Sequence, residues 1–342
     1  MADAFVTEEM MQDGVRPFLK ENDVLKVLFF GSSNRREMRD TVKAIEAFKR
    51  DELAVPAELE TEIVDCDLLI VHLCPVTKRL LNLAEKLKAI LSCRGGNENI
   101  DVSAATAKKI IVTSYAAHNA NAVAEYTVGL IICESRNIAR ANFALKNGEW
   151  REKFPNTETQ IKELKDLKIG IIGFGSVGRL VAEKMKALGS EILISTPHIS
   201  ENAYDLLNFN FVDLDTLLEE SDVISLHARA DKVIIGEREF SLMKPTAYFI
   251  NTARSILVDS SALENVLRGN KILGAAIDVF ESEPNIATFY RDLDNVTVTN
   301  HRGGDTINSY KDAPNFAINN YISYLAGYSL KFWVNKKELF NK

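Results

Sequence analysis

One short stretch, Lys168–Gly178, constrains the fold more than any other part of this sequence. Its first half, Ile169–Ile172, is apolar and rich in β-branched residues, which is typical of a strand buried on both faces of a parallel sheet. Three glycines follow at Gly173, Gly175 and Gly178, and the next residues have a helical pattern. A strand, a glycine turn and a helix in this order predict a site for the phosphates of a dinucleotide. The alternative is a glycine-rich turn between a strand and a helix that binds no ligand.

Apolar segments alternate with helical patterns along most of the chain, which predicts an α/β fold. With 342 residues the chain is long enough for two domains, each with its own core. Besides the strand of the glycine motif, we expect strands at residues 24–30, 68–71, 89–92, 110–112, 191–196, 223–227, 247–251, 274–278 and 296–299. We expect helices at residues 37–48, 80–87, 122–146 and 315–325, and a short one that begins at Asp101.

The predicted helix at Ala122–Lys146 is the longest, and it ends at Asn147-Gly148, a typical stop signal. It lies between the first predicted sheet and the glycine motif, so it should bridge two domains or form a subunit contact. The helix at residues 315–325 is expected to return to the first domain.

Charge and cysteine content exclude several classes of function. The chain has 41 Lys and Arg against 48 Asp and Glu, a formal net charge of −7, which opposes binding to nucleic acid or to an anionic membrane. Its four cysteines have no metal-ligand or disulfide-like spacing, so we expect reduced thiols in a cytoplasmic protein and no metal site. We also expect no signal peptide and no segment that spans a bilayer.

Three charged residues lie past predicted strand ends: Arg254, Glu283 and His301. Because functional loops lie beyond the carboxyl ends of parallel strands, we expect these residues to act together. An arginine can hold a carboxylate by two hydrogen bonds, a histidine can exchange a proton, and a nearby carboxylate favours the imidazolium. With a nicotinamide, this set would serve the reversible oxidation of a 2-hydroxy acid. The alternatives are a salt-bridged surface arginine, an ordinary turn glutamate and a hydrogen-bonded loop histidine.

The other four histidines have different expected places. His72 and His118 are expected to be structural or to lie at the surface. His198 and His227 follow strands of the second sheet and are expected to line the adenosine side of the dinucleotide site.

Five motifs occur together in this chain: VAEYTVGL at 123–130, GFGSVG at 173–178, MKP at 243–245, INTAR at 250–254 and GAAIDVFESEP at 274–284. In them the chain resembles the NAD(P)-dependent D-2-hydroxyacid dehydrogenases, which include phosphoglycerate dehydrogenases, glyoxylate/hydroxypyruvate reductases and formate dehydrogenase. The resemblance runs from about Leu68 to Asn335.

The resemblance implies two Rossmann-like or flavodoxin-like parallel-sheet domains with an active-site cleft between them. The substrate-binding (catalytic) domain would comprise residues 1–114 and 304–342, and the NAD(P)-binding Rossmann domain residues 115–303. It also implies a homodimer formed through the Ala122–Lys146 helix. Because the chain ends soon after Asn335, no added regulatory domain is expected.

By matching residues, the resemblance implies that Arg254 binds the substrate carboxylate, that His301 is the acid–base, and that Glu283 is the partner of His301. The backbone of the loop Arg94, Gly95, Gly96 and Asn97 would hold the substrate, and its Cys-Arg-Gly-Gly form is similar to a phosphoglycerate-dehydrogenase-like subgroup. Asp278 would contact the nicotinamide carboxamide. The full cofactor-binding set is Gly173, Gly175, Ser176, Val177, Gly178, Thr196, His198, His227, Ala228, Thr252, Ala253, Arg254, Asp278, His301 and Gly303.

The chain departs from the family pattern at the residue that accepts the adenosine ribose hydroxyls. Thr196, followed by Pro197 and His198, stands where NAD-binding members place Asp or Glu. No arginine stands in its immediate place, so NADP preference does not follow either. We expect NAD as the cofactor, with NADP as the alternative. Other departures are Ala116-Ala117, Ala228-Arg229, Ser255 and Asn300.

Three further arginines bear on the substrate: Arg94, Arg229 and Arg302. One interpretation is that Arg94 or Arg302 receives a second anionic group, so that the substrate would be a phosphorylated acid of the 3-phosphoglycerate type. The other is that these arginines pair with surface acids, which we favour for Arg229. A small acid such as glyoxylate or hydroxypyruvate is the other substrate candidate. The alternative functions are a dinucleotide-sensing, corepressor-like scaffold without catalysis and, less favoured, formate oxidation.

Overall fold

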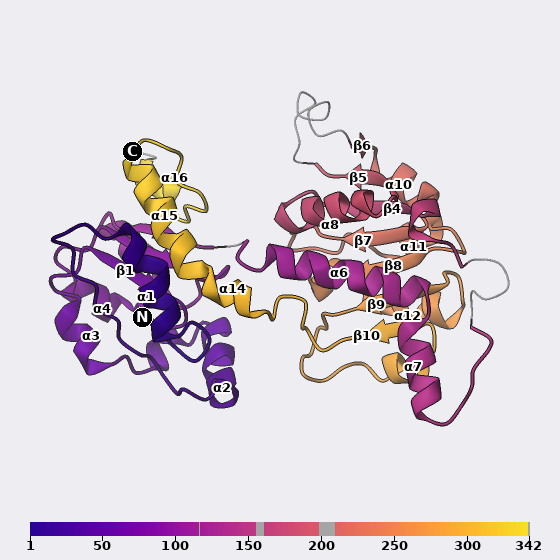
Figure 1. Cartoon of the computed structure of the whole chain (residues 1–342), viewed down its shortest axis with the longest axis horizontal. Helices are drawn as coiled ribbons and strands as arrows, with labels where there is room; N and C mark the ends of the chain where they lie inside the picture. The colour runs from indigo at the N-terminus through magenta and orange to yellow at the C-terminus, as the bar shows by residue number, and fades with distance from the viewer. Residues whose placement is uncertain (116, 155–160, 198–208, 341–342) are drawn as a thin grey trace. The chain divides into compact units, whose positions relative to one another are not determined.

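The computed structural model describes residues 1–115, 117–154, 161–197 and 209–340, and it divides into two units (Figure 1). Unit 1 comprises Met1–Asn119 and Thr306–Lys342, and unit 2 comprises Ala120–Asp305. The domain boundaries expected from the sequence, 114/115 and 303/304, lie within a few residues of these limits. His198 and Ala116 lie outside the described residues.

Unit 1 is built on a three-stranded parallel sheet of β1 (Leu68–Val71), β2 (Ala89–Ser92) and β3 (Ile111–Thr113), in that order. Successive side chains of a strand point to opposite faces, so the central strand β2 contributes to two cores. Ile90 packs in one core with Leu69 and Val112, whereas Leu91 packs on the other face with Met11 and Tyr321. The helices are α1 (Glu8–Val15), α2 (Arg35–Glu46), α3 (Ala57–Glu62), α4 (Lys78–Leu83), α5 (Val102–Ala107), α14 (Ile307–Lys311), α15 (Ala313–Leu325) and α16 (Lys336–Phe340).

The expected last helix corresponds to α15, which contacts α1 and β2 and therefore does return to unit 1. The predicted N-cap Asp101 accepts a hydrogen bond from the Ala104 amide, 2.9 Å away. The predicted helix at 80–87 is shorter and ends at Leu83, because the side chain of Lys108 donates to the Ala84 carbonyl 3.1 Å away and satisfies the end of the helix.

The strand expected at residues 24–30 is wrong. Of these residues, Phe29 alone forms a bridge, to Ala2, flanked by hydrogen bonds of 2.9 Å between Ala2 and its neighbours Leu28 and Phe30. A single residue of the N-terminal segment is the pairing partner, so no ladder extends along the segment, and Val24 is 92% exposed. The apolar composition of this segment reflects packing in the two cores of unit 1 rather than membership of its sheet.

Unit 2 contains a seven-stranded parallel sheet in the order β10-β9-β8-β7-β4-β5-β6. Strand β4 pairs with β5 on one side and with β7 on the other, so the chain changes direction across the sheet at β4, where the glycine turn begins. The two-residue strand β6 has too weak an apolar pattern to be predicted. The strands are β4 (Lys168–Ile172), β5 (Glu191–Ser195), β6 (Asn210–Phe211), β7 (Val223–Leu226), β8 (Tyr248–Asn251), β9 (Gly274–Ile277) and β10 (Val296–Val298).

Helices cover both faces of this sheet (Figure 1). Helices α6 (Ala120–Ser135) and α8 (Ser176–Ala187) pack in one core through residues such as Ile131 and Val181. On the other face, α10 (Leu214–Glu220), α11 (Glu237–Leu242) and α12 (Ser260–Arg268) contribute Leu217, Phe240 and Leu263 to a second core. Short elements complete the unit: 3₁₀ segments at Leu164–Asp166 and Ser255–Leu257, and α13 (Phe289–Asp292).

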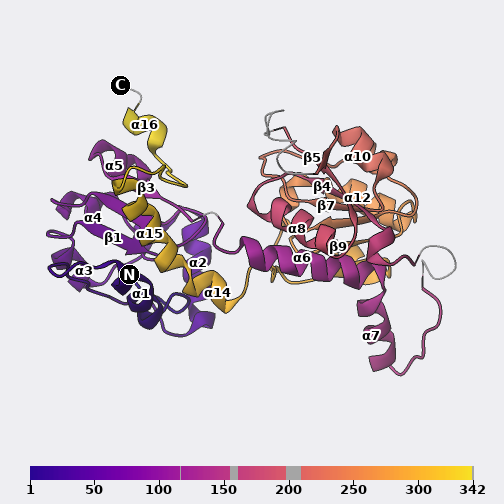
Figure 2. The same ribbon diagram turned by 45° about the horizontal axis from the view of Figure 1, so that its top comes forward.

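The single helix predicted for residues 122–146 is two helices, α6 and α7 (Ile138–Lys146), separated at Asn137, whose φ is +56° (Figure 2). The break lets two buried charges meet. Glu134 accepts hydrogen bonds from Arg140 and, at 2.6 Å, from Thr297 of β10, while Arg140 Nε donates to the Asp294 carbonyl 2.5 Å away. Residues six apart on a straight helix point about 120° apart around its axis, so one continuous helix would separate this pair.

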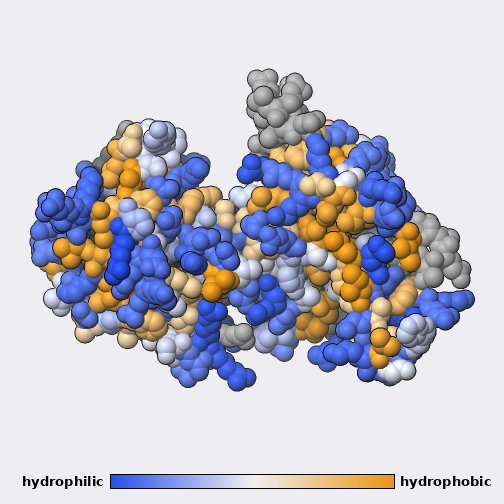
Figure 3. Space-filling model, in the orientation of Figure 1, coloured by the Kyte–Doolittle hydropathy of each residue, from blue (hydrophilic) through white to orange (hydrophobic). Residues whose placement is uncertain are grey.

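Burial raises the pKa of Glu134, and Arg140 opposes this rise. Beyond the break, α7 exposes apolar side chains. Ile138 is 52%, Phe143 73% and Leu145 59% exposed. Trp150, shortly after the helix, is 80% exposed. Figure 3 shows hydrophobic residues among hydrophilic ones on this part of unit 2.

Candidate functional site

The glycine turn between β4 and α8 has the geometry that the sequence predicts. Gly173 has a φ of +91°, and a Cβ atom there would lie 2.6 Å from the backbone nitrogen of Ala228. A Cβ atom at Gly178 would overlap the carbonyl oxygen of Gly173. At Gly175, by contrast, no atom of the described residues lies within 4 Å of the Cβ position. The first and third glycines are therefore required by the fold, whereas the second faces open space.

The first turn of α8 offers hydrogen-bond donors to this open space. Gly175 is the N-cap and supplies no side-chain cap, and the first amide with an intrahelical partner is that of Arg179, which donates to the Gly175 carbonyl over 3.0 Å. The amides of Ser176, Val177 and Gly178 thus lie at the positive end of the helix without acidic side chains beside them. This arrangement fits the pyrophosphate of a dinucleotide.

The strand ends beside the turn hold two of the other predicted cofactor residues. Thr196 follows β5 directly and is half-buried. The His227 ring is partly buried beside the turn, with Nε2 at 2.8 Å from the Ser225 hydroxyl, and its backbone nitrogen donates to the Ile172 carbonyl over 2.7 Å. Burial lowers the pKa of His227 to about 3, so this ring is neutral at physiological pH. A neutral side chain here adds no charge to the surface next to the phosphate turn.

The segment after β8 presents Arg254, and a buried asparagine shapes it. The Asn251 side chain accepts from the Ala253 amide at 3.0 Å and donates to the Arg254 carbonyl at 3.1 Å. Thr252 is buried, with its hydroxyl 2.8 Å from that of Thr127 on α6. Arg254 is exposed and donates to the Ala253 carbonyl over 2.7 Å; the rest of its guanidinium has no hydrogen-bond partner among the described residues. The sequence placed Asn251 at a strand end but did not indicate this role.

Glu283 and His301 are brought together as the sequence predicts. His301 Nδ1 lies 2.8 Å from Glu283 Oε2, and the other carboxylate oxygen accepts from the Phe280 amide at 3.0 Å. The carboxylate is thereby oriented by the backbone on one side and holds the imidazole on the other. Within the described part of the chain, His301 Nε2 makes no hydrogen bond, so this nitrogen is available to exchange a proton.

Asp278 holds the turn that carries His301. Its carboxylate, 1% exposed, accepts from the Thr299 hydroxyl at 2.6 Å and from the amides of Arg302 and Gly303 at 3.0 Å each. His301 lies between these residues with a φ of +55°. The predicted contact of Asp278 with a nicotinamide carboxamide stays a prediction. The contribution of Thr299 was missed, because only its hydrogen bond to the end of the neighbouring strand β9 reveals it.

The loop expected to hold the substrate follows β2 in unit 1. The amides of Gly95, Gly96 and Asn97 donate to none of the described residues, so three successive donors are available. A Cβ atom at Gly96 would overlap the Glu98 carboxylate, which is the far end of a flexible side chain and can move aside. Glu98 in turn pairs with Arg94, with Oε2 and Nη2 3.5 Å apart.

Ion pairing of the three further arginines differs from the expectation. Arg302 pairs with Asp305 at 2.6 Å, and Arg94 pairs with Glu98, so two of the three have carboxylate partners. Arg229, for which pairing was favoured, is exposed and forms no ion pair within 4.0 Å among the described residues.

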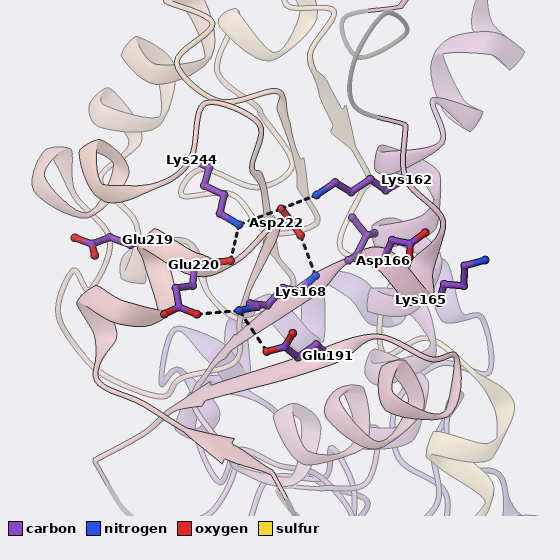
Figure 4. Close-up of a pocket in the computed structure, with 10 residues that line it drawn as sticks. Lys162, Lys165, Asp166, Lys168, Glu191, Glu219, Glu220, Asp222 and Lys244 are labelled. Carbon is purple, nitrogen blue, oxygen red and sulfur yellow. Dashed lines mark hydrogen bonds and ion pairs between the residues drawn. The ribbon is translucent and has the colours of Figure 1, made fainter.

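A charged hollow of about 480 Å³ lies at the opposite end of the unit 2 sheet (Figure 4). Asp222 precedes β7 and accepts from the Nζ atoms of Lys162 and Lys244 at 3.2 Å each and from the Lys168 amide at 3.0 Å. Lys168 also pairs with Glu220 at 2.8 Å. Although burial opposes it, these donors lower the pKa of Asp222. The lysines are therefore engaged in holding the starts of the strands, and this hollow contains none of the predicted site residues.

Comparison with known proteins gives a consistent set of similarities. Residues 128–303 match the family model described as "D-isomer specific 2-hydroxyacid dehydrogenase, NAD binding domain". The chain is 38% identical over 283 residues to a D-3-phosphoglycerate dehydrogenase of Methanocaldococcus jannaschii, a match that covers 80% of this chain and 53% of that protein. It is 34% identical over 270 residues to a glyoxylate reductase of Thermococcus litoralis, covering 77% of this chain and 82% of the reductase.

A solved structure has the same fold. The crystal structure of a D-lactate dehydrogenase with NAD⁺ from Lactobacillus jensenii matches with a TM-score of 0.69 and 25% identity, over 86% of this chain and 96% of that chain. Separately, among the described residues no helix combines the length and the apolar character needed to cross a membrane.

Proposed function

Because this chain belongs to the D-isomer specific 2-hydroxyacid dehydrogenase family, we propose that it interconverts a D-2-hydroxy acid and the corresponding 2-keto acid with NAD. The comparisons confirm three predictions made from the sequence: the family, the Rossmann-like α/β fold and NAD as the cofactor. The observation that supports the reaction most directly is the 2.8 Å pair of Glu283 and His301, which lies on the same unit as the glycine turn.

His301 is proposed as the acid–base. In the oxidation direction its Nε2 takes the proton of the C2 hydroxyl, and in the reduction direction it returns a proton to the carbonyl oxygen. Glu283 occupies Nδ1, which fixes the ring and stabilises the imidazolium that forms. NAD, when bound, supplies the hydride chemistry at C2.

Arg254 is proposed to hold the substrate carboxylate, because most of its guanidinium is without a partner among the described residues and can form a two-pronged contact. The amides of Gly95, Gly96 and Asn97 are proposed as additional donors to substrate oxygens. The residues of the glycine turn, from Gly173 to Gly178, are proposed to hold the pyrophosphate, with the first-turn amides of α8 as donors.

The ion pairs of Arg94 and Arg302 favour a small acid of the glyoxylate or hydroxypyruvate type over a phosphorylated one, because both guanidinium groups already have a carboxylate partner. The deciding experiment is a panel of 2-keto acids, with and without phosphate, assayed with NADH and NADPH. We expect turnover of the small acids with NADH. Turnover restricted to phosphorylated acids would reverse the substrate assignment. NADH binding without turnover of any acid would refute the reaction and favour the sensing scaffold.

We further propose a homodimer formed through α6 and α7, supported by the exposed Ile138, Phe143 and Leu145. Phe143→Glu should convert a dimer to a monomer in light scattering coupled to size-exclusion chromatography, because a charge would be buried at the contact. Tyr328→Glu, at a residue 72% exposed in unit 1, is the matched control and should leave the mass unchanged. A monomeric wild type would contradict the proposal.

The four cysteines, all free, support the predicted cytoplasmic location.

A further inference from the structure

We propose that Thr299 is a positioning residue for His301, an inference that rests on the proposed acid–base function of His301. Thr299 directly follows β10, and its amide continues the sheet by donating to the Ile277 carbonyl over 3.0 Å. Its side chain turns to the end of the neighbouring strand and donates to Asp278 Oδ1 at 2.6 Å. The hydroxyl therefore fixes the chain two residues before the imidazole.

The turn around His301 is closed on a single carboxylate. Asp278 accepts a hydrogen bond from the Thr299 hydroxyl before the histidine, and it accepts two more from the amides of Arg302 and Gly303 after it. Asp278 is itself fixed, because it is buried and its amide donates to the Asn251 carbonyl over 3.0 Å. The chain thus enters and leaves the turn at one rigid point.

His301 has little else to hold its backbone. Its φ of +55° is unfavourable for a residue with a Cβ atom, and such a conformation persists only when its surroundings impose it. Among the described residues, neither its N–H nor its C=O forms a hydrogen bond, and its side chain is 51% exposed. The Glu283 carboxylate orients the ring but does not determine where the backbone places it.

Of the three donors to Asp278, Thr299 alone uses a side chain, so its hydrogen bond can be removed without altering the backbone. Thr299→Val nearly preserves the shape of the side chain and leaves the buried carboxylate of Asp278 with one hydrogen-bond donor fewer. Hydrogen bonds to a charged group are the strong ones, and a displacement of about 1 Å at a catalytic group can cost roughly 100-fold in rate.

The test compares Thr299→Val and Thr299→Ala with Thr299→Ser, by steady-state reduction of the best 2-keto acid of the panel. We expect kcat to fall roughly 10- to 100-fold in Val and Ala, with the KM for NADH unchanged, and Ser to restore most of the rate. Thr216→Val is the matched control, because it also removes a Thr–Asp hydrogen bond, of 2.8 Å to Asp213, but at the surface helix α10. It should leave kcat unchanged.

A double-mutant cycle separates positioning from simple stabilisation. If Thr299 acts through His301, adding Thr299→Val to His301→Ala should cause no further loss of kcat. Three outcomes would overturn the inference. One is a double variant whose loss of kcat is the product of the two single losses, and another is a wild-type kcat in Thr299→Val. The third is that Thr299→Val and Thr299→Ala both fail to fold while Thr299→Ser folds. Wild-type turnover tests the proposed function separately, since these outcomes are ratios between variants of an active enzyme.

Discussion

Alanine substitutions at Gly178 and Gly175 should separate two requirements that the phosphate turn combines. At Gly178 the new Cβ atom would overlap the Gly173 carbonyl oxygen and would lie 3.3 Å from the Cβ atom of His227. Backbone atoms cannot move aside as a flexible side chain can. At Gly175 the same atom meets none of the described residues, and the φ of −80° suits any residue.

The magnitudes follow from these surroundings. Overpacking of a tight site costs about 1–3 kcal/mol, and contact with a backbone carbonyl places Gly178→Ala at the upper end. For a unit of this size each kcal/mol shifts the melting temperature by about 2–4 °C, so about 3 kcal/mol predicts a decrease of about 6–12 °C. Gly175→Ala should change the stability by less than about 0.5 kcal/mol. Its methyl group would occupy the space where the backbone approaches the pyrophosphate, so NAD affinity should fall about tenfold or more.

The assay pairs thermal unfolding without ligand with calorimetric titration of NADH, for the wild type and both variants. We expect a destabilised Gly178→Ala variant and a stable Gly175→Ala variant that binds NADH weakly. A Gly178→Ala variant that melts with the wild type would refute the steric argument. A Gly175→Ala variant with unchanged affinity would refute the placement of the pyrophosphate at this turn.

Three further predictions concern single residues. His301→Ala should lower kcat by roughly 10²–10⁴-fold and leave NADH affinity nearly intact, and wild-type-like turnover would remove His301 from the mechanism. Arg254→Lys should mainly raise the KM for the keto acid, because an ammonium cannot form the two-pronged contact; an unchanged kcat/KM would contradict this role. Burial lowers the pKa of His227 to about 3, below its unfolded value of about 6.5, so the unfolded state binds the extra proton between these values and stability should fall as pH decreases through this window. The melting temperature of His227→Gln should depend less steeply on pH in this range than that of the wild type, and equal slopes would argue against a neutral His227 ring in the folded protein.

Much of unit 2 could be predicted because its strands are buried on both faces. The strand residues 169–172 and 248–250 are apolar throughout, and this composition is readable in the sequence. The segment at residues 24–30 has the same composition but lacks a strand to pair with, and pairing is a property of the whole fold. The break at Asn137 was missed for a similar reason, because it depends on Arg140 reaching Glu134 and on Thr297 from a distant strand.

The residues of the candidate site also differ in how far the sequence predicts them. Arg254, Glu283 and His301 could be identified from their chemistry and their places after strands. The residues that shape their surroundings, Asn251 and Thr299, have ordinary side chains. Asn251 acts through hydrogen bonds within its own loop, and Thr299 through a hydrogen bond to the end of the neighbouring strand. Arg229 shows the converse error, because pairing with an acid was favoured for it, whereas Arg94 and Arg302 are the two that form ion pairs among the described residues.

The edge strand β10 has a consequence for the motion of unit 2. It is three residues long and pairs only with β9 in the described structure, so it should open at a smaller free energy than the central strands. Thr297 donates a hydrogen bond to Glu134, which pairs with Arg140 across the break between α6 and α7. Thr299 donates a hydrogen bond to Asp278, whose carboxylate closes the turn around His301. A single local opening of β10 would therefore break both hydrogen bonds at once. The α7 surface proposed for dimer contact and the proposed acid–base His301 would then respond to the same fluctuation.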